Sequence, residues 1–175
     1  MAFPGGTAVR NAYCLEIIYK EGNTEIMIEE LCKNIYRIGV PLPGNPLKEL
    51  NSYFIKGKDS DLLIDTGFRR EPCLKALQEG LDELASDPAR RDVLLTHLHS
   101  DHSGLADLLV GKGRKIYIHE KDHALLLRFR ETTIPEFRYQ RFIEEGFAKS
   151  DLDEMFRTNP AMTEAMDSTA CTFSI

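Results

Sequence analysis

The fold and the chemistry of this chain are decided by one stretch, THLHSDH, which occupies residues 96–102. This stretch places three of the five histidines and one aspartate within six positions. Imidazole nitrogens and carboxylate oxygens are common protein ligands of divalent cations, above all Zn²⁺. A polar surface loop rarely gathers four such donors so closely. The pattern therefore predicts a metal-binding loop whose ligands are His97, His99, Asp101 and His102.

The loop follows a run of apolar character, DVLLT at residues 92–96, which predicts a β-strand. Side chains two positions apart lie on the same side of an extended chain, so His97 and His99 are expected to face one metal ion together. The aspartate and the last histidine come from the following turn, where Gly104 permits a tight backbone path. Because α/β proteins place their sites at the carboxyl ends of strands, the loop is expected at such an edge of a sheet.

The residues before the loop predict most of that sheet. Strands are predicted at residues 11–20, 24–28, 35–40, 52–55 and 62–64. The last two predict a hairpin, and the run LLI at 62–64, which lacks polar alternation, predicts a strand buried on both faces. The stretch PLPGNP at 41–46 contains three prolines and predicts a shaped loop, which is either a structural turn or the border of a substrate pocket.

Helices alternate with strands in the next part of the chain. Four leucines at helical spacing (Leu74, Leu77, Leu81 and Leu84) predict a helix at 71–85. After the strand at 92–96, a helix at 103–110 and a strand at 115–119 are predicted. This order, strands first and then β-α-β-α-β, predicts an α/β fold with a layered sheet and crossover helices.

The remaining residues predict a helical segment and an irregular tail. Helices are predicted at 122–130, 134–149 and 150–157, whereas residues 161–175 have no clear period. Five aromatic side chains of this segment either wall a substrate pocket or pack the helices together: Phe129, Phe137, Tyr139, Phe142 and Phe147. Three arginines either meet an anionic substrate or face solvent: Arg128, Arg138 and Arg141.

The stretch at 96–102 resembles the H-x-H-x-D-H signature of the metallo-β-lactamase fold superfamily of metallo-hydrolases. The run LLIDTG at 62–67 is similar to the family's strand that ends in Asp-x-Gly beside the metal centre, and NSYFI at 51–55 is similar to the strand before it. The resemblance covers roughly residues 28–119. It implies an αββα sandwich, of which this chain holds the N-terminal half and a helical, cap-like insertion.

On this resemblance the chain divides into four parts. They are an N-terminal extension at 1–25, the N-terminal half of a metallo-β-lactamase-like domain at 26–120, a helical insertion at 121–160 and an irregular tail at 161–175.

The resemblance also implies roles for five residues. His97 and His99 would bind a first zinc ion, and Asp101 and His102 a second, while Asp65 would orient a ligand or the loop. Asp101 would also act in catalysis by positioning a metal-bound hydroxide that attacks an ester, thioester, lactone or similar bond of a small molecule. Redox members of the family often have glutamate in place of the second histidine, so His99 favours zinc over iron. No residue is predicted to bind another cofactor.

The family's downstream ligands have no counterpart in the 175 residues. No T-P-G-H-x-x-G-H stretch follows, and His119 and His123 lack the family's context, so neither is predicted to be a ligand. The chain alone is therefore expected to bind one or two zinc ions weakly and to turn over slowly or not at all. The alternative is a catalytically incompetent, truncated fragment or an interaction module. Its uncovered sheet surface would favour self-association.

The composition of the chain argues against some classes of binding partner. A net charge of −6 argues against a nucleic-acid partner and against a polybasic membrane patch. No run is long and apolar enough to span a bilayer, and the first residues do not read as a signal peptide. The four cysteines are widely spaced and are expected to be reduced thiols, which is typical of a cytoplasmic protein.

Overall fold

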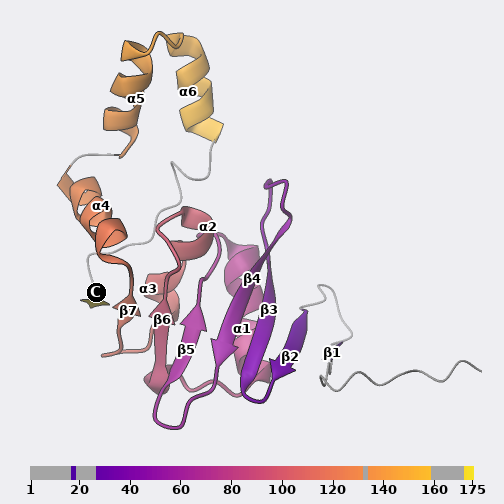
Figure 1. The fold of residues 1–175 in the computed structure, drawn as a ribbon. Coiled ribbons are helices and arrows are strands. Elements are labelled where there is room, and N and C mark those ends of the chain that lie inside the picture. The colour runs from indigo at the N-terminus through magenta and orange to yellow at the C-terminus, as the bar shows by residue number, and fades with distance from the viewer. Residues whose placement is uncertain (1–16, 19–26, 132–133, 159–171) are drawn as a thin grey trace, which may run out of the picture.

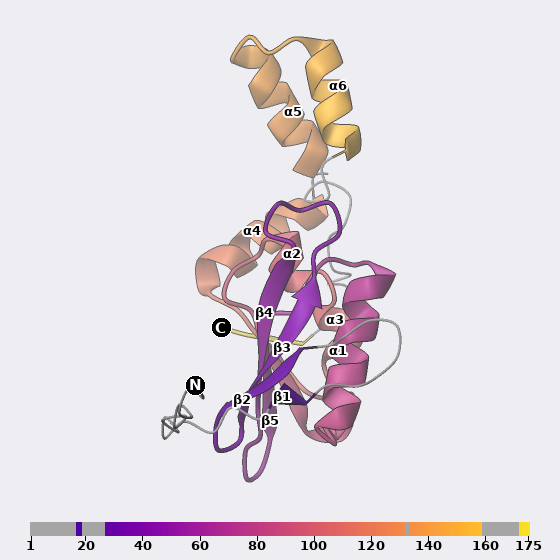
Figure 2. The ribbon, with the colours of Figure 1, turned by 90° about the vertical axis from the view of Figure 1, so that its right-hand side faces the viewer.

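The computed structural model describes residues 17–18, 27–131, 134–158 and 172–175. Its strands form one sheet in which spatial order follows chain order from β1 to β8. Strands β1 to β5 are antiparallel neighbours, and β5 to β8 are parallel neighbours. Helices α1 and α3 lie on one side of this sheet (Figures 1 and 2). The predicted α/β class with crossover helices is confirmed.

The antiparallel part is a meander. Its strands are β1 (Ile17–Ile18), β2 (Ile28–Cys32), β3 (Ile35–Pro41), β4 (Glu49–Ile55) and β5 (Asp61–Ile64). The predicted hairpin is confirmed, with Tyr53 opposite Ile64. Of the strand predicted at 24–28, residues 24–26 lie outside the described residues; β2 begins at Ile28 and continues to Cys32, beyond the predicted end. Glu29 continues that strand, and its carboxylate lies 2.8 Å from the Arg37 guanidinium on β3. Apart from β1, the strand predicted at 11–20 lies outside the described residues.

The parallel part contains the crossovers. Its elements are α1 (Glu71–Glu83), a 3₁₀ turn (Pro88–Arg90), β6 (Arg91–Leu94), α2 (Ser100–Ser103), α3 (Ala106–Leu109), β7 (Ile116–Tyr117) and β8 (Phe173–Ser174). Two predictions need correction. The helix predicted at 103–110 is only α3, while α2, which ends at Ser103, was not predicted; the tail at 161–175 contributes β8, which pairs with β7. Two residues are too few for a periodic signal.

The core lies between the sheet and α1 and α3. Its largest fully buried side chains include Phe54, Ile38, Leu63 and Leu77. Gly80 brings α1 close to the sheet, because a Cβ at this position would lie 2.9 Å from Ile38 Cγ2. The opposite face of the sheet is less covered. Along β5, Leu63 is buried whereas its neighbours are half-buried, so the prediction that this strand is buried on both faces was wrong.

The helical segment consists of α4 (Glu120–Glu131), α5 (Ile134–Glu144) and α6 (Lys149–Thr158). The helix predicted at 134–149 ends earlier, and Gly146 follows it with a φ of +90°, a conformation that favours glycine. The rings of Tyr139 and Phe142 lie 5.4 and 6.4 Å from that of Phe156. These contacts favour packing between α5 and α6 over a pocket wall. The side chains of Phe129, Phe137, Arg128 and Arg138 lie outside the description.

Three smaller findings bear on the predictions. Cys32 is exposed, and Cys73 is buried with its Sγ 3.0 Å from Pro41 O, whereas Cys14 and Cys171 lie outside the described residues. The proline-rich loop is held by its own hydrogen bonds, among them Leu42 N–H to Lys48 O at 2.6 Å, as a structural turn would be. Among the described helices, none combines the length and the apolar character needed to cross a bilayer.

Candidate metal centre

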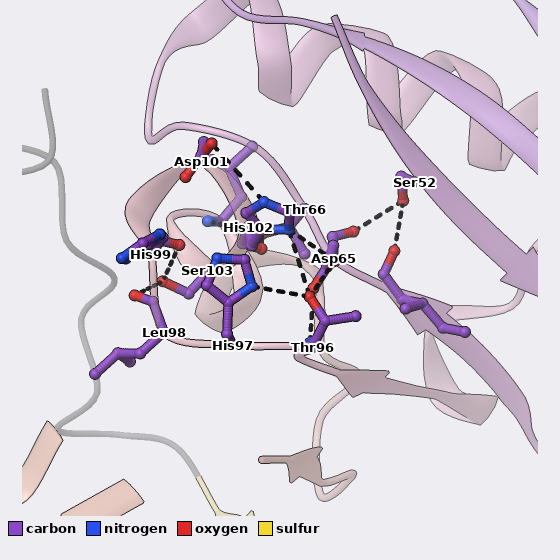
Figure 3. Close-up of polar contacts among 12 residues, drawn as sticks. Ser52, Asp65, Thr66, Thr96, His97, Leu98, His99, Asp101, His102 and Ser103 are labelled. Carbon is purple, nitrogen blue, oxygen red and sulfur yellow. Dashed lines mark hydrogen bonds and ion pairs between the residues drawn. The ribbon is translucent and has the colours of Figure 1, made fainter. Parts of the chain in front are cut away.

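The predicted ligands lie at the carboxyl end of β6, where the chain leaves the sheet and enters α2 (Figure 3). His97 and His99 belong to the connecting loop, and His99 is the residue before the first turn of α2. Asp101 and His102 belong to α2 itself. The expected position at the edge of the parallel strands is confirmed.

The three imidazole rings of the stretch form a cluster. The centroid of the His97 ring lies 4.6 Å from that of His99 and 4.1 Å from that of His102. Asp101 joins the cluster through His102, whose Nε2 lies 3.8 Å from Asp101 Oδ2. This distance is too long for a hydrogen bond, so no proton links the two atoms directly. The structure thus brings all four predicted ligands together.

Asp65 supports the cluster from the end of β5. This residue is 5% exposed, and its carboxylate accepts three hydrogen bonds. The donors are Thr96 N–H at 2.9 Å, Thr96 Oγ1–H at 2.7 Å and the His102 ring at Nδ1, 2.8 Å away. The contact with His102 is the one expected of a residue that orients a ligand.

Backbone geometry holds Asp65 in this place. Its φ is +58°, which is uncommon for a residue with a side chain, and Ser52 Oγ donates a 2.8 Å hydrogen bond to its carbonyl oxygen. Thr66 bonds to His102 O twice, through its amide at 2.7 Å and its hydroxyl at 2.8 Å. A Cβ on Gly104 would lie 2.7 Å from three backbone atoms, including Gly67 O, so only glycine lets the two loops approach this closely.

Charge and burial lower the pKa of two groups of the site and raise that of a third. Burial alone would raise the pKa of Asp65, but its hydrogen bonds with His102 and Thr96 outweigh burial and hold it below the ordinary 3.8. Burial would lower the pKa of His102, but the hydrogen bond and charge of Asp65 raise it above 6.5. Burial, together with the neighbouring His102 and His99, lowers the pKa of His97.

These donors fit zinc by chemistry, and for one pair by distance. Two ligands that each lie about 2.0–2.2 Å from one zinc ion can be at most about 4 Å apart, and the 3.8 Å between His102 Nε2 and Asp101 Oδ2 is within that limit. However, no group of three or more His, Cys, Asp or Glu side chains among the described residues is arranged to hold a metal ion as it stands. The described residues therefore supply possible zinc ligands, of which one pair, His102 Nε2 and Asp101 Oδ2, lies at a suitable distance.

The other two histidines lie elsewhere. His119 Nδ1 accepts a 3.2 Å hydrogen bond from Lys121 N–H at the start of α4, and the His123 ring lies 5.3 Å from that of Phe173. Thr96, Thr66 and Ser52 support the cluster through hydrogen bonds, but the sequence did not predict these roles. Thr96 stands directly before the first histidine and Thr66 directly after Asp65, and position was their only signal.

Comparison with known proteins identifies the family and the fold. The family model described as the metallo-beta-lactamase superfamily matches residues 48–165. A metallo-beta-lactamase family protein from Thermus thermophilus is similar at 25% sequence identity, with a TM-score of 0.65 over 83% of this chain and 47% of its own. A beta-lactamase domain protein from Burkholderia ambifaria has 20% identity and a TM-score of 0.53 over 72% of this chain and 40% of its own. The chain thus spans less than half the length of these relatives.

Proposed function

This chain belongs to the metallo-beta-lactamase superfamily, and from that membership we propose that it is the N-terminal part of a zinc-dependent hydrolase. The substrate class that we propose is a small molecule with an ester, thioester, lactone or similar bond. The observation that supports this most is the cluster of His97, His99 and His102 with Asp101 at the carboxyl end of β6. The fold alone does not select among these bonds, since related folds host different reactions.

Each residue of the cluster has a proposed task. His97, His99 and His102 would supply nitrogen donors and Asp101 an oxygen donor, and a zinc ion bound to them would lower the pKa of a water ligand and polarise a carbonyl group. Asp65 orients His102 by accepting from Nδ1, which leaves Nε2 directed toward Asp101. Asp101 Oδ2 would accept a hydrogen bond from the attacking water and keep it directed at the substrate.

The experiment is a titration of the metal-free chain with Zn²⁺. We expect weak binding that dialysis against a chelator reverses, because the described residues contain no complete ligand group. The double variant His97→Ala/His99→Ala should bind roughly 100-fold less tightly or worse, since loss of a residue that merely orients a ligand already costs about 10–100-fold. His123→Ala is the matched control, because His123 lies outside the cluster, and it should bind as the parent does.

Two outcomes would count against the proposal in different ways. Equal zinc binding by the double variant and the parent would remove the cluster as the site. Two tightly held zinc ions per chain would contradict the expected weakness, although not the site.

The second candidate function is that of a non-catalytic interaction module. The observation in its favour is the half-buried face of the sheet opposite α1, which could accept a partner surface. A panel of thioester, lactone, cephalosporin and phosphodiester substrates, with and without added zinc, separates the two functions when it is run on a chain extended through the second half of the fold, because slow or absent turnover is expected of this part in either case. Zinc-dependent turnover of any of them, lost in His97→Ala/His99→Ala, favours the hydrolase, and binding of zinc without turnover favours the module.

A further inference from the structure

We propose that Thr96 is a positioning residue which, together with Asp65, fixes the ring nitrogen that carries the proton in His97 and in His102. Thr96 lies between β6 and the histidines, and its side-chain oxygen is close to three groups of the cluster (Figure 3). These are Asp65 Oδ2 at 2.7 Å, His97 Nδ1 at 3.1 Å and His102 Nδ1 at 3.5 Å.

Each hydrogen bond at the Asp65 carboxylate has a defined donor. An ionised carboxylate only accepts hydrogen bonds, so each of its partners must donate. Thr96 has one hydroxyl proton, and the 2.7 Å distance to Asp65 Oδ2 shows where that proton lies. The backbone amide of Thr96 donates to the other carboxylate oxygen at 2.9 Å, which fixes Thr96 relative to Asp65.

The Thr96 hydroxyl also determines which nitrogen of His97 carries the proton. Because the hydroxyl proton of Thr96 is used by Asp65, the oxygen faces His97 Nδ1 with a lone pair. The 3.1 Å contact is a hydrogen bond only when Nδ1 of His97 carries a proton and donates it. A neutral His97 ring then has its own lone pair on Nε2.

Asp65 determines the position of the proton on His102 in the same way. Its Nδ1 lies 2.8 Å from the same carboxylate oxygen, so this nitrogen also donates. The lone pair of a neutral His102 is therefore on Nε2, the atom that faces Asp101. One carboxylate oxygen thus sets both rings, the first through the Thr96 hydroxyl and the second directly.

The consequence for ligand binding is specific. A neutral imidazole offers one lone pair to a cation, and the hydrogen bond at the other nitrogen decides where it is. The relevance of these tautomers to zinc rests on the proposed function, whereas the tautomers themselves depend only on the contacts above.

The test is long-range ¹H–¹⁵N NMR of the imidazoles in the metal-free, full-length chain at about pH 9, well above the ordinary histidine pKa of about 6.5. We expect protonated Nδ1 and unprotonated Nε2 for both His97 and His102 in the parent. A parent spectrum with the His97 proton on Nε2 overturns the proposal before any variant is made.

Three variants separate positioning from a merely structural role. Thr96→Val removes the hydroxyl and should release His97 to a mixture of tautomers, while His102, still bound to Asp65, keeps its proton on Nδ1. Thr96→Ser keeps the hydroxyl and should restore the parent spectrum. Ser103→Ala is the matched control, because among the described residues Ser103 Oγ bonds to the carbonyl oxygens of Leu98 and His99 and to no imidazole. An unchanged His97 spectrum in Thr96→Val overturns the proposal.

Zinc affinity of the same proteins is the second readout. Thr96→Val should bind zinc about 10–100-fold more weakly than the parent, and Thr96→Ser should recover most of the affinity. If the parent does not bind zinc, the proposed function fails while the NMR result still stands or falls on its own. If zinc binds equally to both variants although the tautomers differ, the tautomers are real but do not determine affinity, and that part of the inference is overturned.

Discussion

Asp65 is the residue on which the geometry of the histidine cluster depends most. It combines a backbone φ of +58° with a buried carboxylate, and both features cost free energy that its contacts must offset. The contacts with His102 and Thr96 do so in the folded chain (Figure 3). Strain that persists at one position because its surroundings require it is common at functional sites.

The pair of Asp65 and His102 should make the stability of the metal-free chain depend on pH. Because the pKa of Asp65 is lowered in the fold, its contribution is present above about 3.8 and is lost as pH falls through the folded value. Because the pKa of His102 is raised, its contribution is present below about 6.5 and is lost as pH rises through the folded value. The pair is thus most stabilising between these two values.

Asp65→Asn tests this dependence. We expect the variant to unfold with about 1.5–3 kcal/mol less free energy than the parent near pH 5.5, since hydrogen bonds to charged groups contribute about that much. The difference should shrink toward pH 9, where His102 is neutral. Urea unfolding at a series of pH values in chelator measures it. The charge of Asp65 also counteracts the lowering of the His97 pKa, so its removal lowers that pKa further and adds a pH dependence of the same sign. A difference that does not vary with pH would contradict the assignment.

Single residues were predictable where their chemistry is distinctive. Three histidines and an aspartate within six positions predicted the cluster, whereas Asp65 was predicted from the resemblance of residues 62–67 to the family's strand that ends in Asp-x-Gly. Thr96, Thr66 and Ser52 were not predicted, because a hydroxyl side chain occurs in every kind of surface and strand. The roles of Thr96 and Thr66 depend on the approach of chain segments more than thirty residues apart, as between Thr66 Oγ1 and His102 O, and that of Ser52 on contact with the neighbouring strand; no local pattern encodes these contacts.

At the scale of elements, the contact between α1 and β3 fixes how the helix layer lies on the sheet. Gly80 is buried in α1, and Ile38 on β3 is fully buried beneath it. The leucine stripe predicted from helical spacing packs on the same side, with Leu77 and Leu81 in the core. The absence of a side chain at position 80 lets the stripe reach the sheet.

Gly80→Ala should therefore destabilise the chain, although alanine is the better helix former by about 1 kcal/mol. The added Cβ would lie 2.9 Å from Ile38 Cγ2, which belongs to a β-branched side chain with little rotameric freedom. Overpacking of this kind costs about 1–3 kcal/mol, so after the gain in helix propensity we expect a net loss of up to about 2 kcal/mol. Thermal unfolding measures it. Gln78→Ala, at an exposed position of the same helix, is the control and should change stability by less than about 0.5 kcal/mol. A more stable Gly80→Ala would show that the helix can shift freely.

Helices and strands were predictable where a recognisable sequence pattern extends over enough residues. The helix α1 and the β4–β5 hairpin agree with the prediction, because each repeats its pattern several times. The short helices α2 and α3 do not, since each has only four residues, too few to repeat a helical pattern. Strand β8 was missed because two residues form it and its partner, β7, is more than fifty residues away in the chain.

At the scale of the whole molecule, the described residues cover one face of the sheet far better than the other. Strand register places Ile64 beside both Tyr53 and Leu94, and Leu94 beside Tyr117. Alternation directs these four side chains away from the face that carries Leu63 and the helices. They form an apolar stripe across four strands, and Tyr117 is 37% exposed. A continuous apolar surface of this kind is typical of a contact surface.

We expect this apolar stripe to make the chain self-associate. Sedimentation velocity over a range of concentrations should show a larger species that grows with concentration. Tyr117→Lys would place a charge in the stripe and should weaken association about 10-fold, which is equivalent to about 1.4 kcal/mol. Leu108→Lys is the matched control, because Leu108 is 50% exposed on α3, on the helix side. Both variants change the net charge of −6 by the same amount, so long-range repulsion cannot explain a difference between them. A chain that stays monomeric throughout, or two variants that behave alike, would show that the stripe is not the contact surface.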